Sequence, residues 1–406
     1  MVTEVKTQVA IVGGGMVGAV LASALGRSGI PVMLLESRPP EMDWPEASVD
    51  MRVSALSLSS QNILQTLDVW SDMAAMNISP YRYMKVWDAL YDGELIFDGA
   101  DVGKDIMGHI VENRVTVAAL WRSLERMSGV TLLCPAQVTD LSLEKAGAYL
   151  RLSDGQLIQA ELVVGADGRD SHMRELAGIA VTGWLYDHEA LVATVETGEL
   201  HRQTAYQRFL KEGPLAFLPL KNGASSIVWS STAETTHSYL QLSDDDFLQT
   251  LQVASGGILG EMKGVSPRAA FPLRYQFANS YTGQRLALIG DAAHAMHPLA
   301  GQGVNMGLLD AAALAEVILT AHGKNRSIAS DTVLHRYARM RKGDNLLMMS
   351  TMDALKKVFG VSSVPFGHLR AMGMNTVNRT ALLRNYFNRH AMGLRPGLPK
   401  LAYGEA

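Results

Sequence analysis

Three glycines near the start of the chain, Gly13, Gly15 and Gly18, have the spacing Gly-x-Gly-x-x-Gly between a short apolar run and a helix-like run. At such a turn the first glycine permits the tight bend, the second lets the main chain approach a pyrophosphate, and the third allows close helix packing. Glu36 follows the next apolar run, where a carboxylate accepts hydrogen bonds from ribose hydroxyls and repels a ribose phosphate. The pattern therefore predicts a βαβ unit that binds FAD or NAD rather than NADP.

A second candidate turn follows the buried-strand pattern AELVVG and contains Asp167 and Gly168. Ser171 and Arg174 lie about one helical turn further on, so their side chains can share a face with the turn. Two interpretations are open here. Asp167 belongs to the ligand site, or it caps the next helix and Arg174 is an exposed partner.

The third candidate is the glycine-rich stretch that opens with Gly290 and Asp291. A carboxylate at the end of a strand can hold a ribityl or ribose hydroxyl, and we expect Gly301, Gly303 and Gly307 to clear space beside a flat ring. A helix that begins near Gly303 turns the positive end of its dipole toward the ligand, which favours negative charge there.

Buried strands and helices must position these turns. The composition of the chain is typical of a protein with a large hydrophobic core. The chain has 406 residues, 48% of them hydrophobic, which suits two or three closely packed units. A net charge of -4 gives no reason to expect a nucleic-acid partner. The single cysteine, Cys134, is expected to be core filler in a reducing compartment.

The chain has no signal-peptide pattern, and Asp310 and Glu316 interrupt its best candidate for a membrane span. We therefore expect a cytoplasmic protein, at most peripheral on the inner face of the membrane. The β-rich segment 190–230 separates the strands of the nucleotide-binding unit, which predicts an α/β protein with interleaved domains. The expected units are a discontinuous Rossmann-like dinucleotide-binding domain (1–74, 109–180 and 281–338), a mostly antiparallel β-sheet substrate domain (75–108 and 181–280) and a C-terminal helical region (339–406).

The three turns together resemble one family. GGGMVG, GADG and GDAAH are similar, in the same order, to the nucleotide fingerprints of the p-hydroxybenzoate-hydroxylase-like flavin monooxygenases, over residues 5–345. Within that superfamily, HPLAGQGVNMGLLD (297–310), RVSALS (52–57) and GHIVEN (108–113) resemble the ubiquinone-biosynthesis FAD-dependent hydroxylases. PYRYMKVWD is most similar to the hydroxylase that acts at ring position C6 on a polyprenyl-3-methyl-6-methoxy-1,4-benzoquinol.

The resemblance implies that FAD is the cofactor, and it implies a role for each matching residue. The cofactor-binding residues would be Gly13, Gly15, Gly18 and Glu36 for the ADP half, Arg52 near the flavin or its pyrophosphate, Asp167 near the pyrophosphate, Gly290 and Asp291 for the ribityl chain, and Gly303. The residues lining the flavin and the active site would be Arg52, His297, Pro298, Leu299, Ala300, Gly301, Gln302, Gly303, Val304 and Asn305.

The resemblance also implies the reaction. Reduced FAD and O2 give a C4a-hydroperoxyflavin, and the electron-rich ring of a polyprenylated phenol or benzoquinol takes one oxygen atom from it. The protein positions the ring and excludes water, so no residue is assigned as a catalytic acid or base. His109 and His297 are better explained as structural or flavin-orienting groups, and no metal site is expected. Electrons would come from NAD(P)H or from a protein reductant.

Three functions are open at this point. The first is FAD-dependent hydroxylation of a polyprenylated ubiquinone precursor, at C6 or alternatively at C5 or C1. The second is the same chemistry on a small soluble aromatic. The third is a non-catalytic flavoprotein or prenyl-lipid carrier, which the presence of all three fingerprints disfavours.

The C-terminal segment 339–396 carries ten Lys and Arg against Asp344 and Asp353, with methionines at many of its apolar positions. Basic amphipathic helices can rest on an anionic membrane, where a polyprenylated substrate dissolves, and Lys356 and Lys357 would then contribute to binding. An ordinary helical cap with its arginines in solvent explains the same pattern. A membrane surface and a complex of ubiquinone-biosynthesis enzymes are both possible partners.

Overall fold

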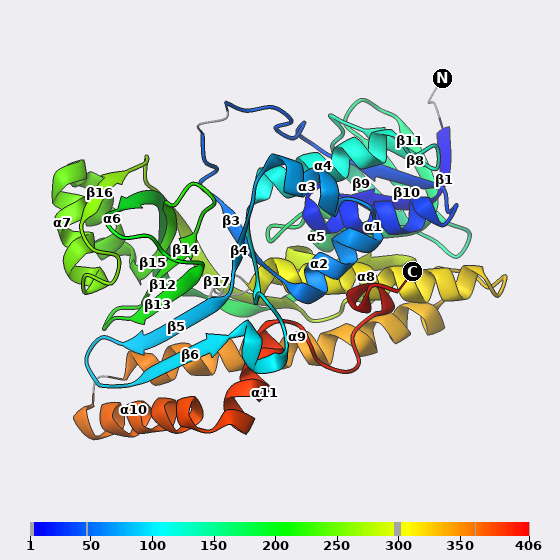
Figure 1. Cartoon of the computed structure of the whole chain (residues 1–406). Helices are drawn as coiled ribbons and strands as arrows, with labels where there is room; N and C mark the ends of the chain where they lie inside the picture. Colours follow the sequence, from blue (N-terminus) through cyan, green and yellow to red (C-terminus); the bar gives the residue numbers. More distant parts are fainter. Residues whose placement is uncertain (1–3, 46–47, 296–301, 362, 406) are drawn as a thin grey trace.

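The computed structural model describes residues 4–45, 48–295, 302–361 and 363–405. Its first sheet has five parallel strands in the order β19-β11-β1-β2-β8, as a doubly wound nucleotide-binding fold requires (Figure 1). Strand β18 and the hairpin β9-β10 add antiparallel neighbours. The strands are β1 (Glu4–Val12), β2 (Val32–Leu35), β8 (Val130–Leu133), β9 (Val138–Leu143), β10 (Ala148–Leu152), β11 (Leu157–Gly165), β18 (Thr282–Gly283) and β19 (Leu286–Leu288).

Three helices enclose the core of this sheet, namely α1 (Met16–Arg27), α4 (Asn113–Glu125) and α8 (Gln302–His322). Helix α8 packs against α1 and is almost wholly apolar because it is enclosed on most sides. It is long and apolar enough to cross a membrane, yet 78% of its most apolar window is buried inside the protein. We therefore interpret α8 as a core helix.

The second sheet contains nine strands and is antiparallel apart from the pair β13–β5. Their order is β20-β17-β12-β15-β14-β13-β5-β6, and β16 pairs with β12. Helices α6 (Ala233–Gln241) and α7 (Asp244–Ser255) lie beside it, and α7 closes its core with Phe247 and Leu251. The strands are β5 (Tyr83–Asp88), β6 (Glu94–Asp98), β12 (Val181–Thr197), β13 (Thr204–Phe209), β14 (Pro214–Pro219), β15 (Ser225–Thr232), β16 (Met262–Val265), β17 (Ala269–Ala278) and β20 (His294–Ala295).

A small three-stranded sheet lies between the two large ones (Figure 1). It has the order β3-β7-β4 and is accompanied by the helices α2 and α3. The bounds are β3 (Val53–Ser57), β4 (Ile78–Tyr81), β7 (Gly108–Glu112), α2 (Leu58–Thr66), α3 (Trp70–Met76), the short helix α5 (His172–Leu176), and the 3-10 turns η1 (Gly99–Val102), η2 (Gly290–Ala292) and η4 (Lys400–Tyr403).

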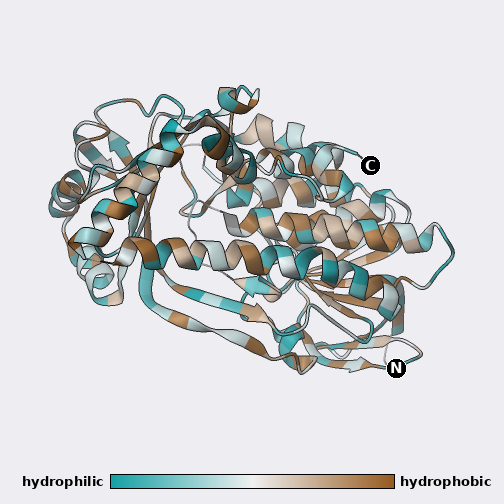
Figure 2. Ribbon diagram, turned by 90° about the horizontal axis from the view of Figure 1, so that it is seen from below, coloured by the Kyte–Doolittle hydropathy of each residue, from teal (hydrophilic) through white to brown (hydrophobic). Residues whose placement is uncertain are grey.

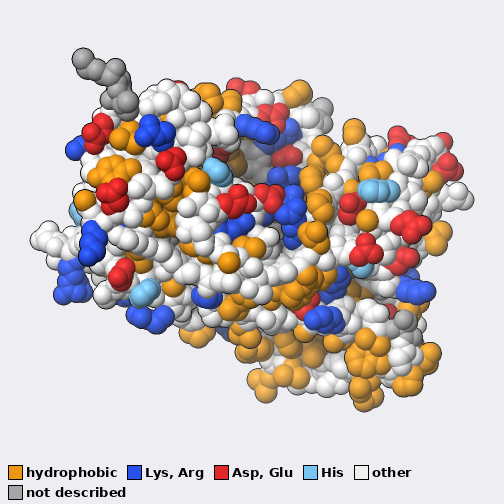
Figure 3. All heavy atoms as spheres, turned by 180° about the vertical axis from the view of Figure 1, so that it is seen from behind, with side chains coloured by type: hydrophobic (Ala, Val, Ile, Leu, Met, Phe, Trp, Pro, Cys, Tyr) orange, Lys and Arg blue, Asp and Glu red, His pale blue; other side chains and the backbone are white. Residues whose placement is uncertain are grey.

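The C-terminal region is helical, as expected. Helix α9 (Asp331–Gly360) runs beneath both large sheets (Figure 1). Figure 2, which views the molecule from below, shows this helix running across it. Helices α10 (Val364–Arg379) and α11 (Ala381–Ala391) then fold under the β5–β6 hairpin. In Figure 3 they form the lower lobe of the molecule, where hydrophobic side chains gather on the surface.

The structure changes the interpretation of the C-terminal cations. Five of the ten form ion pairs with carboxylates of the same chain, namely Arg341, Lys357, Arg370, Arg384 and Arg395. Lys357 pairs with Asp353 at 2.7 Å, and Lys356 lies 3.4 Å from the centre of the Tyr186 ring, where burial lowers its pKa to about 8. A membrane contact through this region must therefore use other side chains.

The mixed α/β architecture with a parallel and an antiparallel sheet is confirmed. The domain boundaries stay a prediction. Strand β20, inside the segment 281–338, pairs with β17 of the second sheet, so the third glycine-rich stretch links the two sheets.

Candidate active site

The carboxyl ends of four parallel strands meet at one edge of the first sheet. The strand registers align Val12 of β1 with Leu35 of β2 and with Gly165 of β11, and they align Gly165 with Leu288 of β19. Each predicted turn, and Glu36, follows one of these four residues. In an open α/β sheet this edge is where ligands bind, so the strand pairing itself brings the predicted residues together.

The three glycines of the first turn differ in their surroundings. Gly13 has a φ of +110°, and a Cβ there would lie 2.3 Å from the carbonyl oxygen of Ala166. A Cβ on Gly18 would lie 2.0 Å from the carbonyl oxygen of Gly13. Gly15, the N-cap of α1, has an ordinary φ of -67°, and in the described part of the chain no atom lies within 4 Å of an added Cβ. The fold itself requires Gly13 and Gly18, whereas Gly15 borders open space at a helix N-terminus.

Glu36 lies across this turn. Its Oε2 accepts a hydrogen bond from the backbone N–H of Gly14 at 2.7 Å, and its side chain is half-buried. The remaining lone pairs of the carboxylate can accept hydrogen bonds from hydroxyls of a ligand. From the buried side, Trp121 donates from Nε1 to the carbonyl oxygen of Gly14 at 2.7 Å. Trp121 therefore fixes the turn, a role that no sequence motif indicates.

The second turn distinguishes the two interpretations of Asp167. Its Oδ2 accepts a hydrogen bond from the N–H of Met173 at 2.9 Å, and its Oδ1 accepts one from Oγ of Ser171, the N-cap of α5, at 2.6 Å, so Asp167 supports the N-terminus of α5. Arg174, however, is buried, and its Nη1 donates to the carbonyl oxygen of Ala292 at 3.0 Å. The alternative in which Arg174 is exposed is wrong, because its guanidinium joins the second turn to the third. A role for Asp167 at a pyrophosphate stays a prediction.

Asp291 is exposed at the third turn. Partial desolvation nevertheless raises the pKa of its carboxyl, while the charges of His294, Arg52 and Arg169 oppose the rise. Arg52 was expected here from the sequence, whereas Arg169 was not. Its only sequence signal is its place directly after Gly168 in the second turn.

Helix α8 begins beside this edge, directly after a part of the motif that falls outside the described residues. That part comprises His297, Pro298, Leu299, Ala300 and Gly301. The backbone of Gln302 opens the helix, and its side chain is also outside the description. Among the described residues no atom lies within 4 Å of a Cβ added at Gly303, and Val304 is half-buried. The contact of Gly303 with a ligand stays a prediction.

Gly307 does not clear space for a ring. A Cβ at Gly307 would lie 2.7 Å from Cγ2 of Val17 and 3.2 Å from the Cα of Gly290. This glycine lets α8 pack closely on α1 and on the third turn, so the sequence-based expectation for Gly307 is wrong.

The Asn305 amide is used within the protein. Its Nδ2 donates to the carbonyl oxygen of Ala55 at 2.8 Å, and its Oδ1 accepts hydrogen bonds from the N–H of Ser57 at 3.0 Å and from Ser60 Oγ at 2.7 Å. These bonds fix the first turn of α8 to the strand that follows Arg52. The structure thus gives Asn305 a positioning role, where the sequence suggested a group that lines the flavin.

Behind the third turn lies a buried ion network centred on Asp310 of α8. Asp310 accepts hydrogen bonds from His294 Nε2 at 2.5 Å, from Arg341 Nε at 2.8 Å, from Asn345 Nδ2 at 2.9 Å and from the N–H of Gly290 at 3.1 Å. Burial alone would raise the pKa of Asp310, but the charges of His294 and Arg341 outweigh it and lower the pKa to about 2. The network holds the Gly290 turn against α8 and α9. The sequence signal for this network is Asp310 itself, a carboxylate within a mainly apolar segment.

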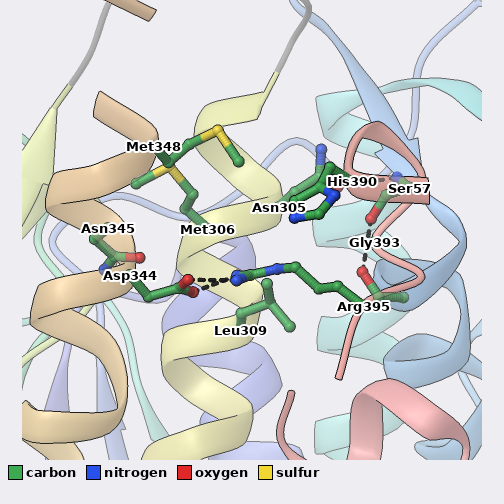
Figure 4. A pocket seen from close by; sticks show the side chains of 11 residues that line it. Ser57, Asn305, Met306, Leu309, Asp344, Asn345, Met348, His390, Gly393 and Arg395 are labelled. Carbon is green, nitrogen blue, oxygen red and sulfur yellow. Dashed lines mark hydrogen bonds and ion pairs between the residues drawn. The ribbon is translucent and has the colours of Figure 1, made fainter. Parts of the chain in front are cut away.

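A pocket lies on the other side of this network. Arg341 pairs with Asp344 at 2.6 Å, and Arg395 reaches across the pocket to the same carboxylate (Figure 4). The lining comes from α8, α9, the Ser57–Ser59 turn and residues 390–395, with no contribution from β1, β2 or the first glycine turn. We therefore place the nucleotide site at the sheet edge and not in this pocket.

His109 has a structural role. It is 6% exposed, its ring stands edge-on to Trp70 with centroids 4.8 Å apart, and its Nδ1 has no hydrogen-bond partner. Burial lowers the pKa of His109 to about 4, so the imidazole is neutral at physiological pH. This supports the structural interpretation over a proton carrier.

Because unfolding restores the ordinary pKa of about 6.5, the unfolded chain binds a proton more readily than the folded protein below that pH. The free energy of unfolding is therefore free of any penalty from His109 above pH 6.5, and it decreases as the pH falls toward 4. We expect His109→Leu to reduce the loss of unfolding free energy between about pH 7 and about pH 4.5 by roughly 2 kcal/mol. Urea unfolding at both pH values measures this. The exposed His322→Leu is the control, and an equal effect there would refute the role of burial.

The comparisons with known proteins agree with this geometry. A family model described as an FAD binding domain matches residues 6–344. The chain is 40% identical to the ubiquinone hydroxylase UbiL of Rhodospirillum rubrum, over 98% of this chain and 92% of that protein. It is 36% identical to the 3-demethoxyubiquinol 3-hydroxylase of Escherichia coli, over 97% and 100%. The p-nitrophenol 4-monooxygenase PnpA of Pseudomonas putida shares the fold, with a TM-score of 0.78, 18% identity and coverage of 97% and 98%.

The fold and the site define an FAD-dependent monooxygenase. More specifically, the chain belongs to the family of FAD-dependent hydroxylases of ubiquinone biosynthesis.

The residues present at the sheet edge fit FAD. Open space at Gly15 leaves room for a pyrophosphate at the N-terminus of α1, and the carboxylate of Glu36 stands where a ribose would lie. Asp291 and Gly303 line the same edge from the third turn and from α8.

Proposed function

We propose that this enzyme is the C6 hydroxylase of the pathway and that it hydroxylates a polyprenyl-3-methyl-6-methoxy-1,4-benzoquinol at its one unsubstituted ring carbon. The pathway's label C6 refers to that carbon, not to the carbon that carries the methoxy group in the substrate's name. The observation that carries the proposal is the similarity to the E. coli 3-demethoxyubiquinol 3-hydroxylase along the whole of that protein. The name of that relative describes hydroxylation of a quinol that lacks a methoxy group, and the proposed substrate has one ring carbon that still bears hydrogen. The enzyme adds one oxygen atom at that carbon.

In this proposal the residues of the sheet edge bind and orient the cofactor. The backbone N–H groups at the start of α1 bind the pyrophosphate next to Gly15, and Glu36 accepts hydrogen bonds from the ribose. Asp291 holds the ribityl hydroxyls, and Arg52 and Arg169 supply positive charge nearby. When bound and reduced, FAD supplies the chemistry that activates O2.

The protein contributes geometry rather than proton transfer. The amino end of α8 stabilises negative charge on the cofactor through its dipole, and Asn305 fixes the direction of that helix. The network around Asp310 fixes the Gly290 turn, which carries Asp291, against the same helix. Two parts of the cofactor site are thus tied to one rigid element, which is what orientation of an aromatic ring against a flavin requires.

A substrate panel tests the ring position. The FAD-loaded enzyme is reduced under nitrogen, freed of reductant and mixed with O2 and one of four compounds. These are the proposed quinol, a polyprenyl methoxyphenol, a polyprenylphenol without other substituents, and p-hydroxybenzoate. We expect the quinol to gain one oxygen at least about tenfold faster than the others, a difference of roughly 1.4 kcal/mol in transition-state stabilisation.

Faster hydroxylation of either polyprenylphenol would contradict the proposed ring position and favour C5 or C1. Hydroxylation of p-hydroxybenzoate alone would contradict a lipid substrate. Fragmentation of the product by mass spectrometry locates the new hydroxyl group.

A further inference from the structure

Helices α10 and α11 depart from the usual pattern of a helix on the surface of a soluble protein. On such a helix, apolar side chains face the protein and polar ones face water. Here the face toward the protein carries the polar residues Arg370 and Asn388 beside the apolar Ala371 and Met374, and the face toward solvent carries leucine, methionine and aromatic residues.

The inner face of α10 is held by specific polar bonds. Asn375 Oδ1 accepts a hydrogen bond from the N–H of Glu94 at 3.1 Å, and Asn378 Oδ1 accepts one from the N–H of Ile96 at 3.0 Å. These are alternate N–H groups of β6, the edge strand of the second sheet, so the helix satisfies an edge that would otherwise be open. Arg370, which is buried, pairs with Asp88 of β5.

The inner face of α11 is similar. Arg384 forms two hydrogen bonds with Asp101, from Nε at 3.1 Å and from Nη2 at 3.2 Å. Asn388 is buried and donates from Nδ2 to the carbonyl oxygen of Asp98 at 2.7 Å. Both helices are therefore fixed in this orientation, and their apolar face is not exposed through loose docking.

The outer face carries several exposed apolar side chains, and we call it the α10–α11 face; Figure 3 shows hydrophobic side chains gathered on the lobe that these helices form. Leu382, the most exposed of its side chains, is 85% exposed, and Met372 is 65% exposed. A monomer in water rarely exposes so many large apolar side chains together, so such a face marks a surface that is covered in use. Its members are Val364, Leu369, Met372, Leu382, Leu383, Tyr386 and Phe387.

The charge around this face favours one kind of partner. The sequence has no Asp or Glu between Asp353 and Glu405. Arg379 and Arg389 are exposed beside the apolar side chains, and neither forms an ion pair within the described part of the chain. This face combines apolar and aromatic side chains with arginines that have no neighbouring acid in the sequence. Such a combination suits the interface between the headgroups and the acyl chains of an anionic membrane.

A second copy of the chain fits this face less well. A two-fold contact would bring the same patch of each subunit together, and the cations of one copy would meet those of the other with no acid on either face to pair with them. Like charges opposed in this way weaken an interface.

We propose that the α10–α11 face docks on the surface of an anionic phospholipid membrane. Leu382, Tyr386 and Phe387 enter the boundary between headgroups and acyl chains, and Arg379 and Arg389 meet the lipid phosphates. The proposal rests on the proposed function only for the reason why the enzyme would bind a membrane, namely that a polyprenylated quinol is dissolved in the bilayer. It replaces the expected contact through Lys356 and Lys357 with a mainly apolar one.

Flotation of the FAD-loaded enzyme with vesicles of phosphatidylethanolamine and phosphatidylglycerol tests the proposal. We expect the wild-type enzyme to float and the double variant Leu382→Ser/Phe387→Ser to bind at least about tenfold more weakly. The matched control is Leu200→Ser/Val253→Ser, which removes two exposed apolar side chains elsewhere and should leave binding unchanged. Arg379→Glu/Arg389→Glu should weaken binding to these vesicles much more than Arg326→Glu does.

Three results would overturn the proposal. The first is a wild-type enzyme that does not float, and the second is an equal loss of binding in both apolar double variants. The third is a Leu382→Ser/Phe387→Ser variant that binds vesicles as the wild type does but changes its oligomeric state in sedimentation. Activity on a short-chain, water-soluble quinol separates this proposal from the proposed function. We expect that activity to be the same in the wild type and in the Leu382→Ser/Phe387→Ser variant. Its absence from both would contradict the proposed function and leave the membrane result standing.

Discussion

Replacing Gly15 with Val should abolish FAD retention without unfolding the protein. The backbone at Gly15 has a φ that any residue adopts, and an added Cβ meets no atom of the described residues within 4 Å. The valine side chain therefore occupies the space that the pyrophosphate needs, while the fold tolerates it. We expect FAD affinity to fall at least about 100-fold, or roughly 2.7 kcal/mol. The flavin absorbance per protein after purification, followed by titration of apoprotein with FAD, measures the loss.

Gly343→Val is the matched control, because Gly343 also has open space around an added Cβ but lies on α9, away from the sheet edge. It should retain FAD. Gly18→Val should instead fail to fold, since its Cβ would lie 2.0 Å from a carbonyl oxygen. A folded Gly15→Val protein with a full complement of flavin would refute the placement of the pyrophosphate.

Replacing Asp310 with Asn should cause the largest loss of stability of any single isosteric change that we consider. The carboxylate is fully buried and compensates the charge of Arg341, which is 2% exposed. An amide removes the negative charge between His294 and Arg341 and leaves Arg341 with one of its two carboxylate partners, Asp344. Its NH2 group also faces donors on one side, either those of His294 and Gly290 or those of Arg341 and Asn345. Breaking one partner of a buried ion pair costs about 3–5 kcal/mol. Chemical unfolding of wild type and variant measures the difference, and Asp331→Asn at the exposed start of α9 is the control.

The same variant has a characteristic pH dependence. The pKa of Asp310 is lowered from 3.8 to about 2, so its contribution to stability is complete above pH 4 and is lost as the pH falls toward 2. Asp310→Asn should remove this part of the acid unfolding curve. An unfolding free energy within about 0.5 kcal/mol of the wild type, with an unchanged acid limb, would show that the network is not needed for stability.

The parts of the site that could be predicted are those set by local sequence. The glycine spacing and the acids after apolar runs predicted the turns, because strand ends and helix starts are encoded within a few residues. The parallel pairing then places Glu36, Asp167 and Asp291 at one edge, as the α/β interpretation requires.

The parts that could not be predicted depend on long-range packing. Trp121 and Arg169 carry no motif, and only the fold brings them to the turns. Gly307 has the residue type of a ligand contact, yet its surroundings make it a helix-packing glycine. The C-terminal arginines suggested a basic surface in the sequence. The acidic partners of Arg370 and Arg384, which are Asp88 and Asp101, lie about 280 residues earlier in the chain.

The central claim is that this chain is an FAD-dependent enzyme that transfers one oxygen atom from O2 to a polyprenylated quinol. The most direct test is a single turnover of the reduced, FAD-loaded enzyme with the polyprenyl methoxy-methyl-benzoquinol under isotopically labelled O2, with mass analysis of the lipid. The account predicts a product that contains one labelled oxygen atom and a flavin that returns to its oxidised spectrum. Reoxidation of the flavin with hydrogen peroxide as the only oxygenated product would contradict it.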